Sequence, residues 1–278
     1  MKKSDWKVAI NSAKEIIKSL YIDEPSDIDV IAIAITRGAY VKEDVLKIAE
    51  GRLTILGNQG LITVNSNIPE TGKKRFVMAH ELGHFELHRT QVKAISCNDI
   101  DFNEWGKNKV LETEANYFAA ELLMPEKIFK RKINKKPLSK DFFSYLAQEF
   151  QTTLTATSIR FVTLTEEYAL VCSEKSEIKW FVIGEEFPYR LDVSGKVHPE
   201  SLAYDFFKGK SLPESFFPVS PEAWIDDYKF KGNDEIKEMA IPISSYNQVL
   251  SFIHIDIKDD CVEEDNYYRE LDGRLKFH

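Results

Sequence analysis

The stretch RFVMAHELGHFELHR, residues 75–89, has a His-Glu-x-x-His pattern at its centre, formed by His80, Glu81 and His84. Residues four apart lie on one face of a helix, so both imidazoles can bind one metal ion. In that arrangement they hold Zn²⁺, and the carboxylate of Glu81 takes a proton from the attacking water. The alternative is an ordinary surface helix with solvated histidines. The neighbouring sequence has to decide between these two interpretations.

A catalytic zinc site needs a third protein ligand, and LETEANYFAAELL, residues 111–123, offers one. This stretch is strongly helical in composition and spacing. The face that carries Glu112 also carries Ala115 and Ala119, whose small side chains allow a close approach to the motif helix. Asn116 lies one turn after Glu112 and can hydrogen-bond the second nitrogen of a ligand histidine. Glu112 is therefore the predicted third ligand.

Two side chains leave alternatives open. Glu114 is a second acid in the same stretch, but it points about 160° away from Glu112 on an ideal helix, which makes it the weaker candidate. His88 lies one turn beyond His84, and three collinear histidines cannot all bind one ion. Its position near the helix end favours an interaction with the helix dipole over a substrate role. Gly83 inside the motif helix indicates a close packing partner.

RFVMAHELGHFELH followed by ETEANYFAAELLMP resembles the ImmA/IrrE family of zinc metallopeptidases, over roughly residues 1–130. The preceding LITVNSNIP is similar to the usual lead-in of that family. The resemblance implies a small gluzincin-like peptidase that holds Zn²⁺ with His80, His84 and Glu112 and uses Glu81 as its base. The spelling Glu-x-x-Ala-Asn matches the gluzincin pattern at Glu112. Family members often cleave a helix-turn-helix repressor, and so switch on phage, mobile-element or stress genes.

The chain divides into three predicted segments of an α+β protein. Residues 1–130 form a zincin-like metallopeptidase domain with the motif helix, a small β-sheet and the glutamate-bearing helix. Residues 131–165 form a small helical, helix-turn-helix-like segment. Residues 166–278 form an α+β, sensor-like domain. A helical middle segment followed by such a domain resembles the C-terminal extension of IrrE-type proteins.

Hydrophobic spacing predicts the individual elements within these segments. The expected helices cover residues 1–20, 27–38, 75–89, 111–123, 139–150, 154–164, 199–208 and 221–228. The Val and Ile content of residues 27–38 leaves a strand as the alternative there. A short strand at residues 39–42 and a hairpin of residues 52–56 and 61–65 are expected before the motif, with further strands after residue 168. Residues 89–110 are interpreted as irregular, and the basic run 127–136 as a linker.

Composition narrows the class of protein. The net charge of −8 argues against a protein that coats nucleic acid. No run reaches the roughly 18 apolar residues that a membrane span needs. Cys97, Cys172 and Cys261 are odd in number and widely spaced, which is typical of a reducing compartment. We therefore expect a soluble cytoplasmic protein that does not act on a membrane.

The leading hypothesis is a zinc endopeptidase whose protein substrate is a helix-turn-helix repressor. An extended segment of the substrate is expected to bind along the edge of the hairpin at residues 52–65. Direct binding of DNA by residues 139–164 is less favoured, because Lys140 and Arg160 are the only basic residues there. A helical bundle packed on the peptidase is preferred. The rival hypothesis is a non-catalytic regulator with a structural zinc site. Glu81 argues against that rival, since a structural site needs no base.

Overall fold

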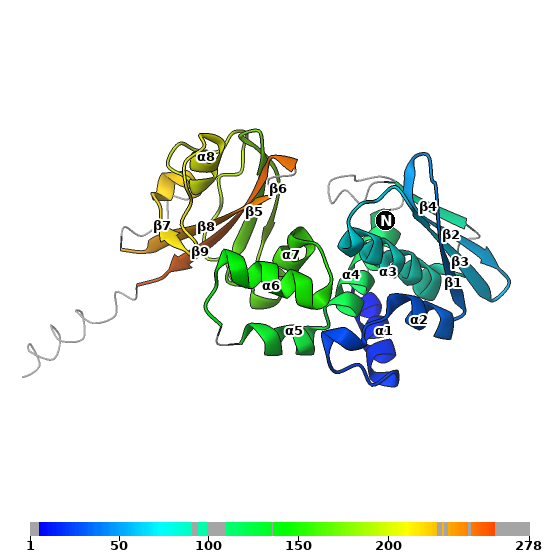
Figure 1. The fold of residues 1–278 in the computed structure, drawn as a ribbon. Helices are drawn as coiled ribbons and strands as arrows, with labels where there is room; N and C mark the ends of the chain where they lie inside the picture. Colours follow the sequence, from blue (N-terminus) through cyan, green and yellow to red (C-terminus); the bar gives the residue numbers. More distant parts are fainter. Residues whose placement is uncertain are drawn as a thin grey trace, which may run out of the picture. The chain divides into compact units, whose positions relative to one another are not determined.

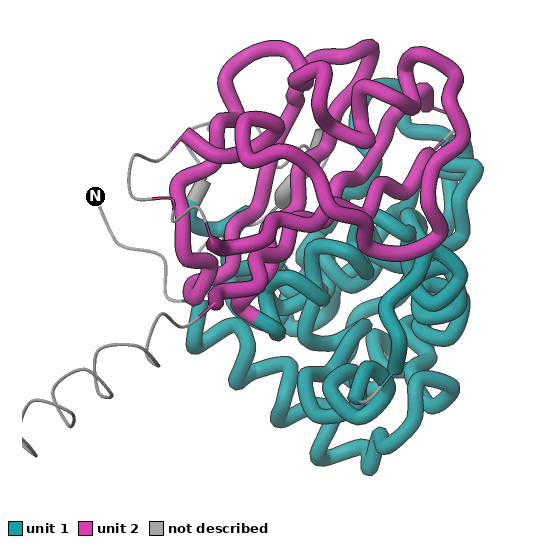
Figure 2. Tube along the Cα trace, turned by 90° about the vertical axis from the view of Figure 1, so that its left-hand side faces the viewer, with its two compact units in different colours: residues 1–165 teal, residues 166–278 magenta. Residues whose placement is uncertain are grey.

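The computed structural model describes residues 6–90, 94–98, 109–134, 136–226, 230, 233–243 and 246–258. The chain divides into two compact units, residues 1–165 and residues 166–278, which are coloured separately in Figure 2. Each unit combines helices with its own β-sheet, so the predicted α+β class is confirmed. In the part of the chain that the structure describes, no helix has the length and apolar character of a membrane span.

The sheet of the first unit has four strands in the order β1-β3-β2-β4. They are β1 (Ala39–Asp44), β2 (Ala49–Leu56), β3 (Gln59–Asn65) and β4 (Ala94–Asn98). Strand β1 runs parallel to β3, and the other pairs are antiparallel. The predicted hairpin is the β2–β3 pair, which turns through Gly57 at a φ of 61°, a conformation that glycine adopts without strain. Strand β4 was not predicted, because it lies in a stretch interpreted as irregular.

The hairpin lies inside the sheet. Strand β3 is paired with β1 and β2, and strand β2 is paired with β3 and β4. Both strands therefore have neighbours on both sides. The expectation that the hairpin offers its edge to a substrate is wrong, and the outer strands of the described sheet are β1 and β4.

The motif helix α3 (Thr71–His88) lies between this sheet and the glutamate helix α4 (Lys109–Leu123), as Figure 1 shows. Helix α1 (Trp6–Ser19) packs on α4. Helix α2 (Val30–Thr36) is a helix despite its Val and Ile content, because the side chain of Asp29 caps its first turn. Contacts on both sides explain why α3 is buried over most of its length, including its histidines.

Two glycines let α3 lie close to the sheet. A Cβ on Gly51 of β2 would overlap the Glu81 carboxylate and lie 2.7 Å from Cγ1 of Val77. A Cβ on Gly60 of β3 would lie 2.8 Å from Cδ2 of Phe85. These contacts define the face of α3 that packs on the sheet.

Three further helices complete the first unit: α5 (Glu126–Ile133), α6 (Lys140–Phe150) and α7 (Leu154–Thr165). The interpretation of residues 127–136 as a linker is wrong, since α5 occupies most of that run. Ile128 and Phe129 are buried, so the helix has an apolar side that the run of charges concealed.

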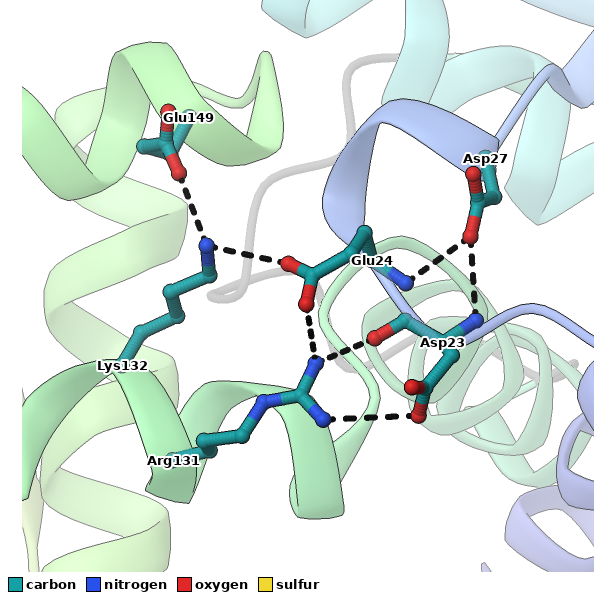
Figure 3. Close-up of polar contacts among 6 residues, drawn as sticks. All are labelled: Asp23, Glu24, Asp27, Arg131, Lys132 and Glu149. Carbon is teal, nitrogen blue, oxygen red and sulfur yellow. Dashed lines mark hydrogen bonds and ion pairs between the residues drawn. The ribbon is translucent and has the colours of Figure 1, made fainter.

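Ion pairs fix the charged side of α5 (Figure 3). Lys132 lies 3.0 Å from Glu24 and 3.2 Å from Glu149 of α6. Arg131 reaches the same Glu24 at 2.7 Å, and also Asp23 at 3.4 Å. The helix is thus tied to the α1–α2 connection and to α6.

Helix α7 is joined to α4 by a buried ion pair. The guanidinium of Arg160 pairs with Glu121, and its Nε donates to the carbonyl oxygen of Met124 at 3.0 Å. At the turn before α7, a Cβ on Gly72 of α3 would lie 2.6 Å from the carbonyl carbon of Thr152. The helices α6 and α7 therefore pack on the helices of the metallopeptidase segment. Arg160 is not available to a DNA phosphate in this arrangement.

The second unit has an antiparallel sheet of five strands in the order β6-β5-β9-β8-β7. Its elements are β5 (Ala169–Glu174), β6 (Glu177–Ile183), α8 (Leu202–Phe207), β7 (Phe217–Pro218), β8 (Glu235–Ile243) and β9 (Gln248–Asp256). The helix expected at residues 199–208 is α8. The helix expected at residues 221–228 is only a 3₁₀ turn, Pro221–Ala223, within its described residues.

A buried carboxylate organises the core of the second unit. Glu238 of β8 accepts hydrogen bonds from Trp224 Nε1 at 2.8 Å and from Ser251 Oγ at 2.7 Å. It also accepts from the backbone N–H groups of Leu202 and Ala203, at the start of α8. Burial raises the pKa of Glu238 above its usual value. Four donors satisfy this group, so its role is structural.

Candidate metal site

Helices α3 and α4 bring three ligand-type atoms to one point. His80 and His84 lie one turn apart on the face of α3 that meets α4, and both are buried. Their Nε2 atoms are 3.0 Å apart. Oε2 of Glu112 lies 3.1 Å from Nε2 of His80 and 3.5 Å from Nε2 of His84. The three ligand atoms all lie within 4.8 Å of one another, a group of the size that holds a single metal ion.

The hydrogen bond behind His80 orients its lone pair toward this point. Nδ1 of His80 lies 2.9 Å from Oδ1 of Asn116. An amide oxygen only accepts, so Nδ1 carries a ring proton, and Nε2 is the nitrogen left to bind a metal ion. Asn116 thus occupies the place that the sequence predicted, as a partner to the second nitrogen of a histidine in the site.

The ionisation of the group suits a metal ion. Burial lowers the pKa of His84 to about 4, so its imidazole is neutral at neutral pH. Burial also acts to raise the pKa of Glu112, but hydrogen bonds with His80 and His84 outweigh it and hold that pKa well below its usual value. A neutral imidazole and an ionised carboxylate are the forms that bind a metal. When all three ligand atoms are deprotonated, their lone pairs repel one another unless a cation lies between them.

Glu81 follows His80 on α3 but occupies a different face of the helix. Its side chain is buried and points toward β2, where it lies against the backbone of Gly51. A Cβ at position 51 would overlap this carboxylate, so the Glu81 side chain would have to move. The chain therefore places an acid on the motif helix, one residue from a candidate ligand, and supports it from the sheet.

Two side chains play a part that the sequence did not predict. His88 ends α3 but is buried, and its Nδ1 lies 3.0 Å from Nδ1 of His84. Nε2 of His88 lies 3.0 Å from Oε2 of Glu114, so this acid does not point away from the motif helix. The available signal was the spacing of four residues between His84 and His88, which makes them neighbours on a helix.

Gly83 has the packing role that the sequence indicated, although with another partner. A Cβ at this position would lie 3.0 Å from Cδ1 of Phe118 and 3.2 Å from its Cβ. The residue of α4 that faces Gly83 is therefore a phenylalanine, and not one of the predicted alanines. The absence of a side chain at Gly83 lets α4 lie close enough for Glu112 to reach both histidines.

Comparisons with known proteins find similarity to metallopeptidases and to a transcriptional regulator. The model of the IrrE N-terminal-like domain, Peptidase_M78, matches residues 37–162. The Metallopeptidase ImmA of Bacillus subtilis (strain 168) is 37% identical over 73 residues, which are 26% of this chain and 38% of that relative. A solved Mycobacterium tuberculosis transcriptional regulator has a TM-score of 0.58, with 15% identity, over 89% of this chain and 76% of that chain. The last likeness concerns the fold alone.

The fold and the donor group together define a metallopeptidase-like α+β domain with a His-Glu-x-x-His helix. Residues 37–162 match the IrrE N-terminal-like domain, and part of the chain is similar to an ImmA metallopeptidase, so both comparisons support the resemblance to the ImmA/IrrE family. The family match ends at residue 162, so it includes helices α5 and α6 and most of α7, whereas the resemblance seen in the sequence ended near residue 130. The chain spans only 38% of the length of the ImmA relative.

Proposed function

We propose that this protein is a zinc-dependent endopeptidase that cleaves a protein substrate, a helix-turn-helix transcriptional repressor. The observation that carries the proposal is the convergence of His80 Nε2, His84 Nε2 and Glu112 Oε2 on one point, with Glu81 on the same helix. The similarity of residues 37–162 to a metallopeptidase family supports hydrolysis as the reaction. The proposed setting is the cytoplasm.

Zinc is the proposed metal because two imidazoles and one carboxylate are a common ligand set of catalytic zinc. His80, His84 and Glu112 would hold the ion and leave a position for water or substrate. When bound, zinc supplies a Lewis acid that polarises the scissile carbonyl and acidifies water. The short separations of the three ligand atoms, 3.0 to 3.5 Å, agree with donors that share one ion.

Glu81 is the proposed catalytic base. Its carboxylate accepts the proton of the attacking water and then donates it to the leaving amine. Burial of Glu81 keeps competing water away from this carboxylate. The contact with Gly51 sets the direction of the side chain, so the backbone of β2 contributes to the position of the base.

The repressor is proposed as substrate from the family resemblance, and the name of the solved neighbour, a transcriptional regulator, agrees with a role in gene control. Strand β4 is the proposed surface for an extended substrate segment, because it is an outer strand next to β2. Direct DNA binding is not favoured. The buried ion pair of Arg160 withdraws one of the two basic residues of the helical segment from solvent.

The test compares the parent protein with a Glu81→Gln variant, with a helix-turn-helix repressor as the candidate substrate. The variant should retain about one zinc per chain but lose cleavage by at least ~10²-fold, because only proton transfer is removed. His80→Ala and His84→Ala should each lose most of the zinc. Cleavage by Glu81→Gln at the parent rate would disprove the catalytic proposal and favour a regulator with a structural zinc site.

A further inference from the structure

A line of polar contacts runs from the metal site to the end of α3. Nδ1 of His84 lies 3.0 Å from Nδ1 of His88, and Nε2 of His88 lies 3.0 Å from Oε2 of Glu114. Both histidines are buried, and the side chain of Glu114 is only 16% exposed. In such surroundings hydrogen bonds are stronger than in water. None of the roles proposed above uses His88 or Glu114.

The carboxylate of Glu114, at the outer end of this line, decides which atoms of the line donate and which accept. A carboxylate only accepts hydrogen bonds, so Nε2 of His88 must carry a proton that it donates to Glu114. The Nδ1 atom of a neutral His88 is then an acceptor, and it receives the Nδ1 proton of His84. With its proton on Nδ1, His84 presents the Nε2 lone pair to the site. Each contact thus determines the tautomer of the next ring.

We propose that His88 and Glu114 are positioning residues, which fix the ring orientation and the tautomer of His84 for metal binding. This inference rests on the zinc site of the proposed function. The ring of His80 is oriented in the same way by a single neutral partner, the amide of Asn116. The two candidate ligands of one helix are therefore held by different means: His80 by one amide, and His84 by a histidine that is itself held by a carboxylate.

The geometry also explains why the third histidine of the motif helix is buried. His88 cannot bind the same ion as His84, since its Nδ1 contacts the opposite side of the His84 ring from the site. A buried imidazole without a hydrogen-bond partner would be costly. Glu114 supplies that partner from α4, so the same helix provides a candidate ligand, Glu112, and the outer end of this line.

Four variants separate positioning from simple packing. His88→Phe keeps a ring of similar size but has no acceptor for His84. His88→Asn is smaller, but its side-chain oxygen can stand where Nδ1 of His88 stood. Glu114→Leu removes the acceptor for His88, whereas Glu114→Gln retains a neutral one. Exposed His198 of the second unit, changed to Asn, is the matched control for the loss of a histidine.

Zinc affinity is measured by competition with a chromogenic chelator, and the thermal midpoint of the zinc-free protein is measured in parallel. We expect His88→Phe and Glu114→Leu to weaken zinc binding by about 10- to 100-fold, the range found for outer-shell partners of zinc ligands. His88→Asn and Glu114→Gln should recover most of the affinity, although His88→Asn is less well packed. His198→Asn should bind zinc as the parent does.

Two results would overturn the inference. Parent-like affinity in His88→Phe and Glu114→Leu would show that the line does not act on the site. Loss of affinity that follows the thermal midpoint, with no recovery in His88→Asn or Glu114→Gln, would indicate packing alone. If His88→Phe does not fold, the two Glu114 variants decide. A parent protein that binds no zinc would refute the proposed function as well, whereas the first two results leave it standing.

Discussion

Glu112 and Glu114 are two residues apart on α4, yet they meet different histidines. Oε2 of Glu112 lies 3.1 Å from His80, whereas Oε2 of Glu114 lies 3.0 Å from His88. We predict that Glu112→Gln weakens zinc binding more than Glu114→Gln does, because Glu112 is one of the three proposed zinc ligands and Glu114 is not. Chelator competition on both variants measures the ranking. The reverse order would assign the third ligand to Glu114.

Acid should destabilise the zinc-free protein through His84. Burial lowers its pKa from the ordinary 6.5 to about 4. Between these values the unfolded chain binds a proton that the folded protein does not. The contribution to the free energy of unfolding is therefore complete above about pH 6.5 and is lost as the pH falls toward 4, by about 3 kcal/mol in total.

Urea unfolding of the zinc-free protein at several pH values between about 7 and 4 measures this loss. A His84→Asn variant, which has no group that titrates in this range at position 84, should show a smaller dependence. Glu112 has a lowered pKa and contributes with the same sign, but only at more acidic pH. An equal slope in parent and variant would exclude His84 as the source.

The sequence predicted some of these residues, but not those whose contacts depend on helix packing. Helical spacing placed His80 and His84 on one face and Asn116 one turn after Glu112, and the structure brings these four side chains together. The same helical wheel turned Glu114 away from the site. A wheel describes direction around one axis, but it does not describe how far a long side chain reaches along the neighbouring helix.

Strand β2 acts on the proposed chemistry through the helix that packs on it. A Cβ on Gly51 would overlap the Glu81 carboxylate, which is the end of a flexible side chain and has to move. We predict that Gly51→Ala lowers the rate of cleavage by about 10-fold or more, because displacing the base removes much of its proton-transfer contribution. Zinc content should stay near the parent value, since His80 and His84 lie on another face of α3.

Cleavage assays and metal analysis on the same preparation test this prediction. Gly57→Ala is a matched control at the hairpin turn, where a Cβ would meet no atom within 4 Å, although the backbone there has a positive φ. That control should cost some stability and little activity. Full activity in Gly51→Ala would mean that the position of Glu81 does not depend on the sheet.

Elements that carry a motif or a strongly helical composition were predicted, and elements defined by their partners were not. Helix α3 was predicted from its His-Glu-x-x-His motif and helix α4 from its composition and spacing, and the structure contains both. Strand β4 has only five residues and exists because it pairs with β2. Helix α5 was mistaken for a linker because its charges dominate its sequence. Its stability comes from two buried apolar residues and from ion pairs with distant acids.

At the scale of the whole molecule, every group proposed for zinc binding lies in the unit of residues 1–165. The sequence predicted a boundary after residue 165 and a second boundary after residue 130. The second boundary would place Arg160 and Glu121 in different domains, although they form a buried ion pair whose side chains are 5% and 2% exposed. It would also remove Thr152 from its contact with Gly72 at the start of α3.

A fragment of residues 1–165 should therefore fold and bind about one zinc per chain, whereas a fragment of residues 1–130 should not fold stably. Removal of α7 leaves the carboxylate of Glu121 without Arg160, and breaking a buried ion pair in this way costs about 3–5 kcal/mol. That cost is a large part of the roughly 5–15 kcal/mol by which a domain is stable.

Circular dichroism melting curves and zinc analysis compare the two fragments. The Arg160→Met variant of the longer fragment tests the contribution of the ion pair alone. Equal melting temperatures and zinc content in the two fragments would show that residues 1–130 are a domain by themselves. If only the longer fragment folds, the helices α5 to α7 belong to the structure that holds the site.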